Sequence, residues 1–165
     1  KDHEYSRIEK VISEKAKDAF FSIPNILDIK NSTKKIQFIS FLAEWCPNCD
    51  YEAIELKDYI NIYNSMVDFS TVMLFSSLSK SNQFISKYAF NSKFIDSECN
   101  VKDEVLNKRT SFFRFRELLG DDRKWGVPLH MIRIINLNEE ELFIIKGESK
   151  KLEVQNFLNE NLKQS

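Results

Sequence analysis

Ile36-Gln37-Phe38-Ile39-Ser40-Phe41-Leu42 and the residues that follow it, Ala43-Glu44-Trp45-Cys46-Pro47-Asn48-Cys49, decide the fold of this chain. The first seven residues form a short, nearly continuous apolar run, which is typical of a buried strand. From Cys49 the apolar positions 49, 53, 56, 60 and 63 recur at intervals of four and three, so the pattern predicts one face of a helix. Two cysteines therefore lie at a predicted junction between a strand and a helix.

The residues after this helix predict the rest of a βαβ unit. A second strand is expected over residues 69–75. Because a helical crossover of this length joins the two strands, we expect them to be parallel. Further helices are predicted over residues 80–90 and, with a weak centre, over 100–119, with a short edge strand over 93–95 between them.

The two ends of the chain complete the predicted layers. Strands over residues 129–135 and 141–146 are joined by a short turn, which predicts an antiparallel hairpin. A terminal helix follows, with Ser149 as its N-cap. A helical stripe over residues 5–20, closed by Pro24, opens the chain. The order of elements predicts an α/β sandwich, with a mixed sheet and helices on both faces.

Length and composition limit the classes of protein that this chain can be. Its 165 residues suit one main domain, which we place at residues 25–165 after an N-terminal helical extension over residues 1–24. With 24 basic and 25 acidic side chains the net charge is -1, so nothing in the charge favours nucleic acid as a partner. Only 3 glycines exclude a glycine-rich phosphate loop, and no apolar run reaches the roughly 18 residues of a membrane span. We expect no cofactor.

The spacing of Cys46 and Cys49 has a chemical meaning at the start of a helix. Unpaired amides and the helix dipole favour an anion there, so the thiolate of Cys46 is stabilised and reactive. Cys49 lies one turn further on and faces inward, so we expect Cys46 to attack and Cys49 to resolve the mixed disulfide. Pro47 suits the first helical turn, where its missing N–H would be unpaired in any case.

The two cysteines have three other interpretations. A zinc site would need two more ligands, and only Cys99, His3 and His130 remain, so we predict no metal. An inert structural disulfide would close too small a ring to gain much loop entropy. A binding or chaperone module could use an apolar patch of the abundant aromatic residues, but it has no chemical need for both cysteines.

Two motifs resemble those of the thioredoxin superfamily. The stretch from Phe41 to Cys49 resembles its active-site signature, and Gly126-Val127-Pro128 resembles its cis-proline signature. The resemblance covers roughly residues 25–163. It implies a thioredoxin-like sandwich with strands parallel at the centre and antiparallel at one edge, an extra N-terminal helix, and a helical insertion before the cis-proline. It also implies a thiol–disulfide oxidoreductase that acts on cysteine-containing proteins and exchanges electrons with a separate donor or acceptor protein.

Glu52 makes the sequence most similar to the TlpA/ResA-like extracytoplasmic oxidoreductases, which carry Cys-x-x-Cys-x-x-Glu. Their usual proline is replaced by Ile54, and the position of thioredoxin's buried aspartate is occupied by Ser40. The proton acceptor for Cys49 is therefore Glu52 or water, and the alternative is that Glu52 only complements the helix dipole. This branch implies a reductase located outside the cytoplasm, in the periplasm or secreted, and the alternative is a cytoplasmic location. The start at Lys1 fits a removed signal peptide or anchor.

The resemblance also assigns substrate-binding and tuning residues. A cis bond before Pro128 exposes the backbone of Val127 beside the nucleophile, where a substrate pairs with it like an added strand. Trp45 completes the predicted substrate contact, and Pro47 and Asn48 form the dipeptide that tunes the redox couple. Two further residues have simpler interpretations: His130 is expected to be a structural histidine on a strand, and Cys99 an unpaired bystander.

Overall fold

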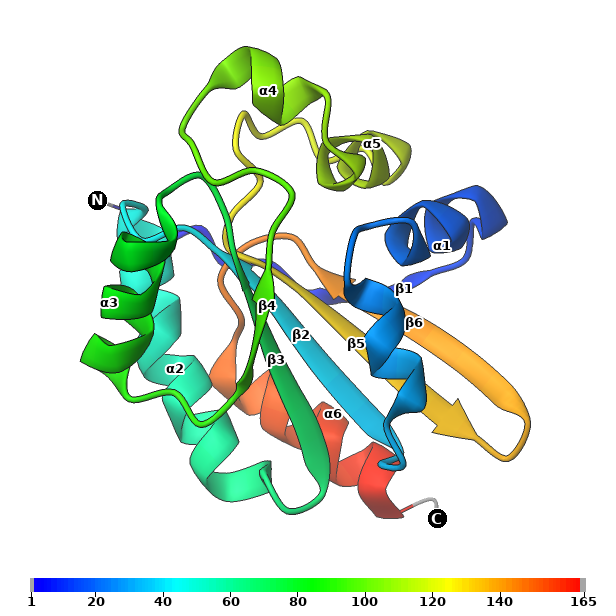
Figure 1. Cartoon of the computed structure of the whole chain (residues 1–165). Coiled ribbons are helices and arrows are strands. Elements are labelled where there is room, and N and C mark those ends of the chain that lie inside the picture. The colour runs from blue at the N-terminus through cyan, green and yellow to red at the C-terminus, as the bar shows by residue number, and fades with distance from the viewer. Residues whose placement is uncertain (1, 164–165) are drawn as a thin grey trace.

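A computed structural model describes residues 2–163 (Figure 1). For residues 27, 29 and 30 within this range, it describes only the backbone. Residue 1 and residues 164–165 of the predicted domain ranges lie outside the described residues. The elements are β1 (Ile8–Val11), α1 (Glu14–Phe21), the 3-10 helix η1 (Ile26–Asn31), β2 (Ile36–Leu42), α2 (Pro47–Tyr63), β3 (Val67–Met73), α3 (Leu78–Tyr88), β4 (Lys93–Asp96), α4 (Glu104–Lys108), α5 (Ser111–Leu118), β5 (Leu129–Asn136), β6 (Glu139–Ile145) and α6 (Lys151–Lys163).

The strands form one mixed sheet in the order β1-β6-β5-β2-β3-β4. β2 is parallel to β3, and β3 is parallel to β4, as the helical crossovers require. β5 lies antiparallel to β2 and to β6, and β1 lies antiparallel to β6 at the edge. The predicted α/β sandwich is confirmed, with parallel strands on one side of the sheet and antiparallel strands on the other.

Helices cover both faces of the sheet (Figure 1). Successive residues of a strand point to opposite faces, and β2 shows the consequence. The ring of Phe38 lies 6.1 Å from that of Tyr59 on α2, whereas the ring of Phe41 stacks at 4.8 Å on that of Phe112 on α5. α2, α3 and α6 thus share one face, and α1 and α5 cover the other. Every residue of β2 is buried, so this strand runs through the centre of the core.

The prediction of a helix over residues 5–20 is wrong for its first half. Residues 8–11 form the edge strand β1, and the helix begins only at Glu14, where the hydroxyl of Ser13 accepts a hydrogen bond from the amide of Ala16 at 3.2 Å. The four residues pair in antiparallel register with Leu142 to Ile145 of β6, and Val11 at the end of the strand is 2% exposed. The apolar spacing alone fitted a helix, but the free edge of β6 recruits this segment into the sheet.

The predicted helix over residues 100–119 is divided into two. α4 ends at Lys108, and the side chain of Thr110 caps α5 by accepting from the amide of Phe113 at 3.0 Å. The two short helices form the predicted insertion before the proline motif. Among the described residues, no helix has both the length and the apolar character needed to cross a membrane.

Candidate active site around Cys46 and Cys49

Cys46 is the N-cap residue of α2, directly after the turn that leaves β2. Its sulfur accepts a hydrogen bond from the amide of Cys49 at 3.3 Å, as an N-cap side chain does. On the other side the same sulfur lies 3.6 Å from the carbonyl oxygen of Val127. Pro47 follows at the first helical position and is exposed. The predicted nucleophile and the predicted substrate-binding backbone are thus in contact.

Cys49 has a more enclosed environment than Cys46. Cys49 is 0% exposed, against 5% for Cys46, and no disulfide joins the two residues. Burial raises the pKa of the Cys49 thiol well above its ordinary value, and the hydrogen bond and charge of Cys46 raise it further. The amide of Ala43 donates a hydrogen bond to the Cys49 sulfur at 3.5 Å, which lowers the pKa of this thiol but does not outweigh burial. Cys49 is therefore held as a protonated inner thiol.

The rings of Trp45, Phe75 and Trp125 form an aromatic cluster next to Cys46 in the fold. The indole N–H of Trp45 donates to the carbonyl of Phe75 at 3.0 Å, and its ring meets that of Trp125 edge-on at 5.6 Å. The ammonium of Lys102 lies 3.8 Å from the centre of the Trp45 ring, within the range of a cation–π contact. The sequence predicted a role for Trp45 but none for Trp125 or Lys102, although Trp125 directly precedes the proline motif.

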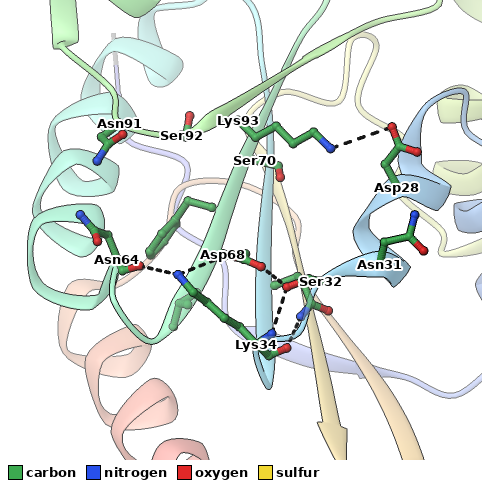
Figure 2. Close-up of a pocket in the computed structure, with 13 residues that line it drawn as sticks. Asp28, Asn31, Ser32, Lys34, Asn64, Asp68, Ser70, Asn91, Ser92 and Lys93 are labelled. Carbon is green, nitrogen blue, oxygen red and sulfur yellow. Dashed lines mark hydrogen bonds and ion pairs between the residues drawn. The ribbon is translucent and has the colours of Figure 1, made fainter.

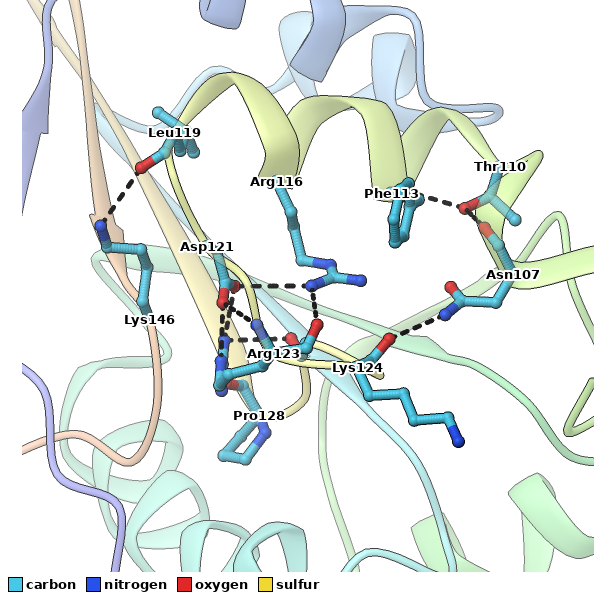
Figure 3. Close-up of polar contacts among 11 residues, drawn as sticks. Asn107, Thr110, Phe113, Arg116, Leu119, Asp121, Arg123, Lys124, Pro128 and Lys146 are labelled. Carbon is cyan, nitrogen blue, oxygen red and sulfur yellow. Dashed lines mark hydrogen bonds and ion pairs between the residues drawn. The ribbon is translucent and has the colours of Figure 1, made fainter. Parts of the chain in front are cut away.

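The peptide bond between Val127 and Pro128 is cis. Arg123 holds this loop from one side, as Figure 3 shows. Its guanidinium donates to the carbonyl of Gly126 at 3.2 Å and to that of Pro128 at 3.0 Å, one on each side of Val127. The same guanidinium donates to both carboxylate oxygens of Asp121 at 2.9 Å. Burial by itself raises the pKa of Asp121, but the hydrogen bonds and charge of Arg123 outweigh it, and the pKa is lowered.

A second arginine, on α5, supports the same loop (Figure 3). Arg116 is 1% exposed and donates to the carbonyl of Arg123 at 2.8 Å. Its Nε and Nη2 have no hydrogen-bond partner among the described residues, and burial lowers its pKa to about 10. Gly126 packs on it so tightly that a Cβ atom there would lie 2.2 Å from the Arg116 Nε. The backbone around Val127 is therefore fixed by two arginines that the sequence analysis did not select.

Glu52 belongs to a buried polar chain beneath the two cysteines. Its Oε1 lies 2.9 Å from Nε2 of His130, and its Oε2 accepts from the amide of Ser149 at 2.9 Å, while the Ser149 hydroxyl also contacts the carboxylate. On the far side, Nδ1 of His130 lies 2.7 Å from the hydroxyl of Ser40, its partner across the sheet. The hydroxyls of Ser149 and Tyr59 lie 2.7 Å apart. His130 is structural in that it joins two strands, yet it also contacts the candidate proton acceptor.

Asn48 and Cys99 have their own hydrogen-bond partners. Asn48 is buried, and its amide nitrogen donates to the carbonyl of Asp2 and to the carboxylate of Glu148. Cys99 is buried, and its sulfur donates to the carbonyl of Val101 at 3.3 Å. Within residues 2–163, no three or more His, Cys, Asp or Glu side chains are grouped as metal ligands.

A pocket of about 600 Å³ lies at the opposite end of the sheet, where β2 and β3 begin (Figure 2). Its lining is polar, and its charges are already paired: Lys34 contacts Asp68 at 3.2 Å, and Lys93 lies 3.9 Å from Asp28. None of the residues selected from the sequence lines it. Cys46 follows the other end of β2, so this pocket is separate from the cysteine pair.

Comparison with known proteins identifies the fold. No protein-family model and no curated protein sequence matches the chain. Among solved structures, a thioredoxin-like protein from Aeropyrum pernix has a TM-score of 0.60 at 14% identity and covers 87% of this chain and 91% of its own. A thiol:disulfide interchange protein of the thioredoxin family from Chlorobium tepidum TLS has a TM-score of 0.55 at 12% identity and covers 98% of both chains. A secreted thiol-disulfide isomerase from Corynebacterium glutamicum has a TM-score of 0.52 at 11% identity and covers 74% of this chain and 67% of its own.

The chain thus has the thioredoxin-like fold, with a pair of cysteines where the central strand meets the first long helix. The fold that the sequence motifs implied is confirmed. The sequence predicted no role for Arg123, which contacts the proline loop, and predicted Ser149, which contacts Glu52, only as a helix cap. A signal existed for Arg123, because an arginine and two aspartates lie just before the proline motif.

Proposed function

We propose that this protein is a thiol–disulfide oxidoreductase that exchanges disulfides with protein or peptide cysteines and acts in the reducing direction. One observation carries the proposal: the sulfur of Cys46 is at the N-terminus of α2, 3.3 Å from the Cys49 amide and 3.6 Å from the Val127 carbonyl. An exchanging thiol needs a helix end to stabilise its thiolate and a neighbouring backbone to hold the substrate. The thioredoxin-like fold and the function of the similar proteins support this interpretation.

The reaction begins with the dithiol form. The Cys46 thiolate attacks one sulfur of the substrate disulfide, so a mixed disulfide forms and the other substrate sulfur leaves as a thiolate. Cys49, after losing its proton, attacks the Cys46 sulfur, releases the second substrate thiol and closes the Cys46–Cys49 bond. Two electrons pass from the enzyme to the substrate in this cycle. A separate donor protein with a dithiol then restores the starting state.

Glu52 is the proposed acceptor of the Cys49 proton, directly or through water. It lies one helical turn after Cys49, it is 1% exposed, and its charge is among the causes that raise the pKa of Cys49. A general base of this kind must be close to the thiol and shielded from bulk solvent. The contacts of Glu52 with His130 and Ser149 hold the carboxylate in place.

The substrate is placed against the proline loop. In this proposal an extended segment beside the substrate cysteine pairs with the backbone of Val127, next to Pro128, and the ring of Trp45 forms the adjacent wall. Pro47 and Asn48 tune the redox couple from within the motif. The Cys-x-x-Cys-x-x-Glu spacing, and a similar structure described as a secreted thiol-disulfide isomerase, support a location outside the cytoplasm, such as the periplasm.

The test is to trap the mixed disulfide. Reduced Cys49→Ser protein, with Cys99 also replaced by serine, is mixed with insulin as a disulfide substrate. We expect a covalent complex through Cys46 that dithiothreitol releases, and we expect none with the matched Cys46→Ser protein. The unmodified protein is expected to reduce insulin catalytically when dithiothreitol is supplied. If Cys46 forms no mixed disulfide, the alternative of a binding or chaperone module with a structural disulfide is favoured instead.

A further inference from the structure

Glu148 is a buried carboxylate that the proposed reaction does not use. It lies in the short connection between β6 and α6 and is 2% exposed. Its Oε2 accepts hydrogen bonds from the backbone amide of Glu4 at 2.6 Å and from the side-chain amide of Asn48 at 2.9 Å. Its Oε1 lies 2.7 Å from Nδ1 of His3. The Glu148 carboxylate therefore joins the N-terminal segment to the start of α2.

The orientation of Asn48 depends on these contacts. Its Nδ2 donates both to Glu148 and to the carbonyl of Asp2, at 2.8 Å, while its Oδ1 has no hydrogen-bond partner among the described residues. An amide that leaves one buried oxygen unpaired is oriented by the groups that its nitrogen contacts. The second residue of the redox dipeptide is therefore covered by residues 2–4 and directed at the Glu148 carboxylate.

The position of Glu148 along α2 is fixed by a second contact. The next residue, Ser149, binds Glu52, which lies about one helical turn beyond Asn48. The connection between β6 and α6 therefore runs along the first turns of α2, and Glu148 is the residue that faces the helix start. Cys46 caps that same helix start.

Resting on the proposed function, we propose that Glu148 lowers the reduction potential of the Cys46–Cys49 couple. The positive end of α2 stabilises the Cys46 thiolate, and a carboxylate at the same helix end opposes it. Because the site is buried, this repulsion is weakly screened by solvent. Destabilising the thiolate disfavours the reduced form, so the disulfide is favoured and the protein becomes a stronger reductant. Glu148 acts through the helix end and Asn48, so it is a positioning residue and not a catalytic one.

The first experiment replaces Glu148 by glutamine and measures the equilibrium of the Cys46–Cys49 pair with glutathione. Glu148→Gln keeps the size of the side chain and an oxygen that can accept from Asn48, but removes the charge. We expect the equilibrium to move toward the dithiol by about tenfold or more, which is a rise in potential of about 30 mV. The matched control is Glu153→Gln, because Glu153 also accepts a backbone amide of the N-terminal segment, from Ile8, at 3.1 Å. We expect its potential to be unchanged.

Two further variants make the result independent of folding defects. Glu148→Asp keeps the charge and is expected to stay close to the unmodified protein. His3→Lys, at a half-exposed position, brings a fixed positive charge to the intact carboxylate and is expected to raise the potential in the same direction as Glu148→Gln. If Glu148→Gln does not fold, as judged by circular dichroism, His3→Lys decides the question.

The outcomes separate this inference from the proposed function. A folded Glu148→Gln protein with an unchanged potential overturns the inference, as does an equal shift in Glu153→Gln. In both cases the proposed function stands if the unmodified protein still exchanges disulfides. If the unmodified protein forms no reversible Cys46–Cys49 disulfide, the proposed function and the inference fail together.

Discussion

At the scale of single residues, Cys46 and Cys49 differ in their surroundings more than in their distance from solvent. Cys46 caps a helix and meets the edge of the proline loop, whereas Cys49 is enclosed between the helix and the turn at Ala43. In the proposed function, this asymmetry is the reason that Cys46 attacks and Cys49 resolves the mixed disulfide. The raised pKa of the Cys49 thiol makes its pH dependence predictable.

We predict that alkylation of the reduced protein labels Cys46 first. The raised pKa of Cys49 keeps this thiol protonated as the pH rises through its ordinary value of 9.0, so it stays unreactive up to at least that pH. The experiment labels the protein with iodoacetamide from pH 5 to 9 in a Cys99→Ser background and locates the label by mass spectrometry. The matched single variants Cys46→Ser and Cys49→Ser identify each reaction. Faster labelling of Cys49 would contradict the assignment of roles.

We predict that Glu52→Gln slows the resolving step. The amide cannot accept the Cys49 proton, so the second half of the exchange is expected to slow by about 100-fold. The measurement is the rate of substrate release from a preformed mixed disulfide. Glu55→Gln is the matched control, because Glu55 lies on the same helix and contacts Lys151 at 3.6 Å. Equal rates for both variants would leave Glu52 only a structural role at the start of the helix.

At the scale of elements, the loop before β5 is held by two arginine side chains. Gly126 has a φ of 70° and packs against the buried side chain of Arg116. Arg123 binds the carbonyls on both sides of Val127. A loop held from two directions presents its backbone in one conformation, which is what recognition of an extended substrate requires.

We predict that Gly126→Ala destabilises the protein more than Gly120→Ala does. Both glycines have a left-handed backbone, with φ of 70° and 72°, which costs an alanine about 1–2 kcal/mol. At Gly120 a Cβ atom meets nothing within 4 Å, whereas at Gly126 it would overlap the Arg116 side chain. Urea unfolding of the two variants gives the comparison. The explanation by steric overlap fails if both lose the same free energy of unfolding.

We predict that Arg123→Lys impairs substrate handling. Lysine keeps the positive charge, but it cannot contact Asp121, Gly126 and Pro128 together as the planar guanidinium does. We expect kcat/KM with insulin to fall by about 10- to 100-fold, mainly through a higher KM, because the loop around Val127 loses its fixed position. The control is Arg109→Lys, at an exposed position. An unchanged KM in a folded Arg123→Lys protein would show that Arg123 only stabilises the fold.

At the scale of the whole molecule, the N-terminal segment is part of the sheet. β1 pairs with β6 from Ile8 to Val11, and the chain before it contacts Glu148. The first residues are thus joined to the last third of the sequence, and through Asn48 to the start of α2. A substitution that unfolds this N-terminal segment is therefore expected to disturb the candidate active site as well.

We predict that Val11→Asp lowers the free energy of unfolding by about 3–5 kcal/mol, because it buries an unpaired charge. Its neighbour provides the control: Ile12 is 79% exposed, and Ile12→Asp is expected to have almost no effect. Urea unfolding followed by tryptophan fluorescence measures both. If Val11→Asp is as stable as Ile12→Asp, the segment does not belong to the cooperative core.

Sequence periodicity by itself determined most elements and the position of the cysteine pair. The strand ending at Leu42 and the helix containing Cys49 follow from apolar spacing over short distances, because a period of two or 3.6 is a local property of the chain. The same local reasoning misassigned residues 8–11, where four residues cannot separate a strand from a helix. Residues 8–11 form a strand because they pair with β6, which lies more than 120 positions away.

Only the tertiary structure decided what surrounds the two sulfur atoms. Glu52 and His130 are 78 positions apart, and His3 and Glu148 are 145 apart, so no local pattern relates them. They meet because the strand register sets Ser40 opposite His130, and because β6 returns its following loop to the start of α2. Side-chain contacts of this range depend on how the strands align and pack. For that reason the sequence identified the cysteine pair, and only the fold identified the side chains that surround it.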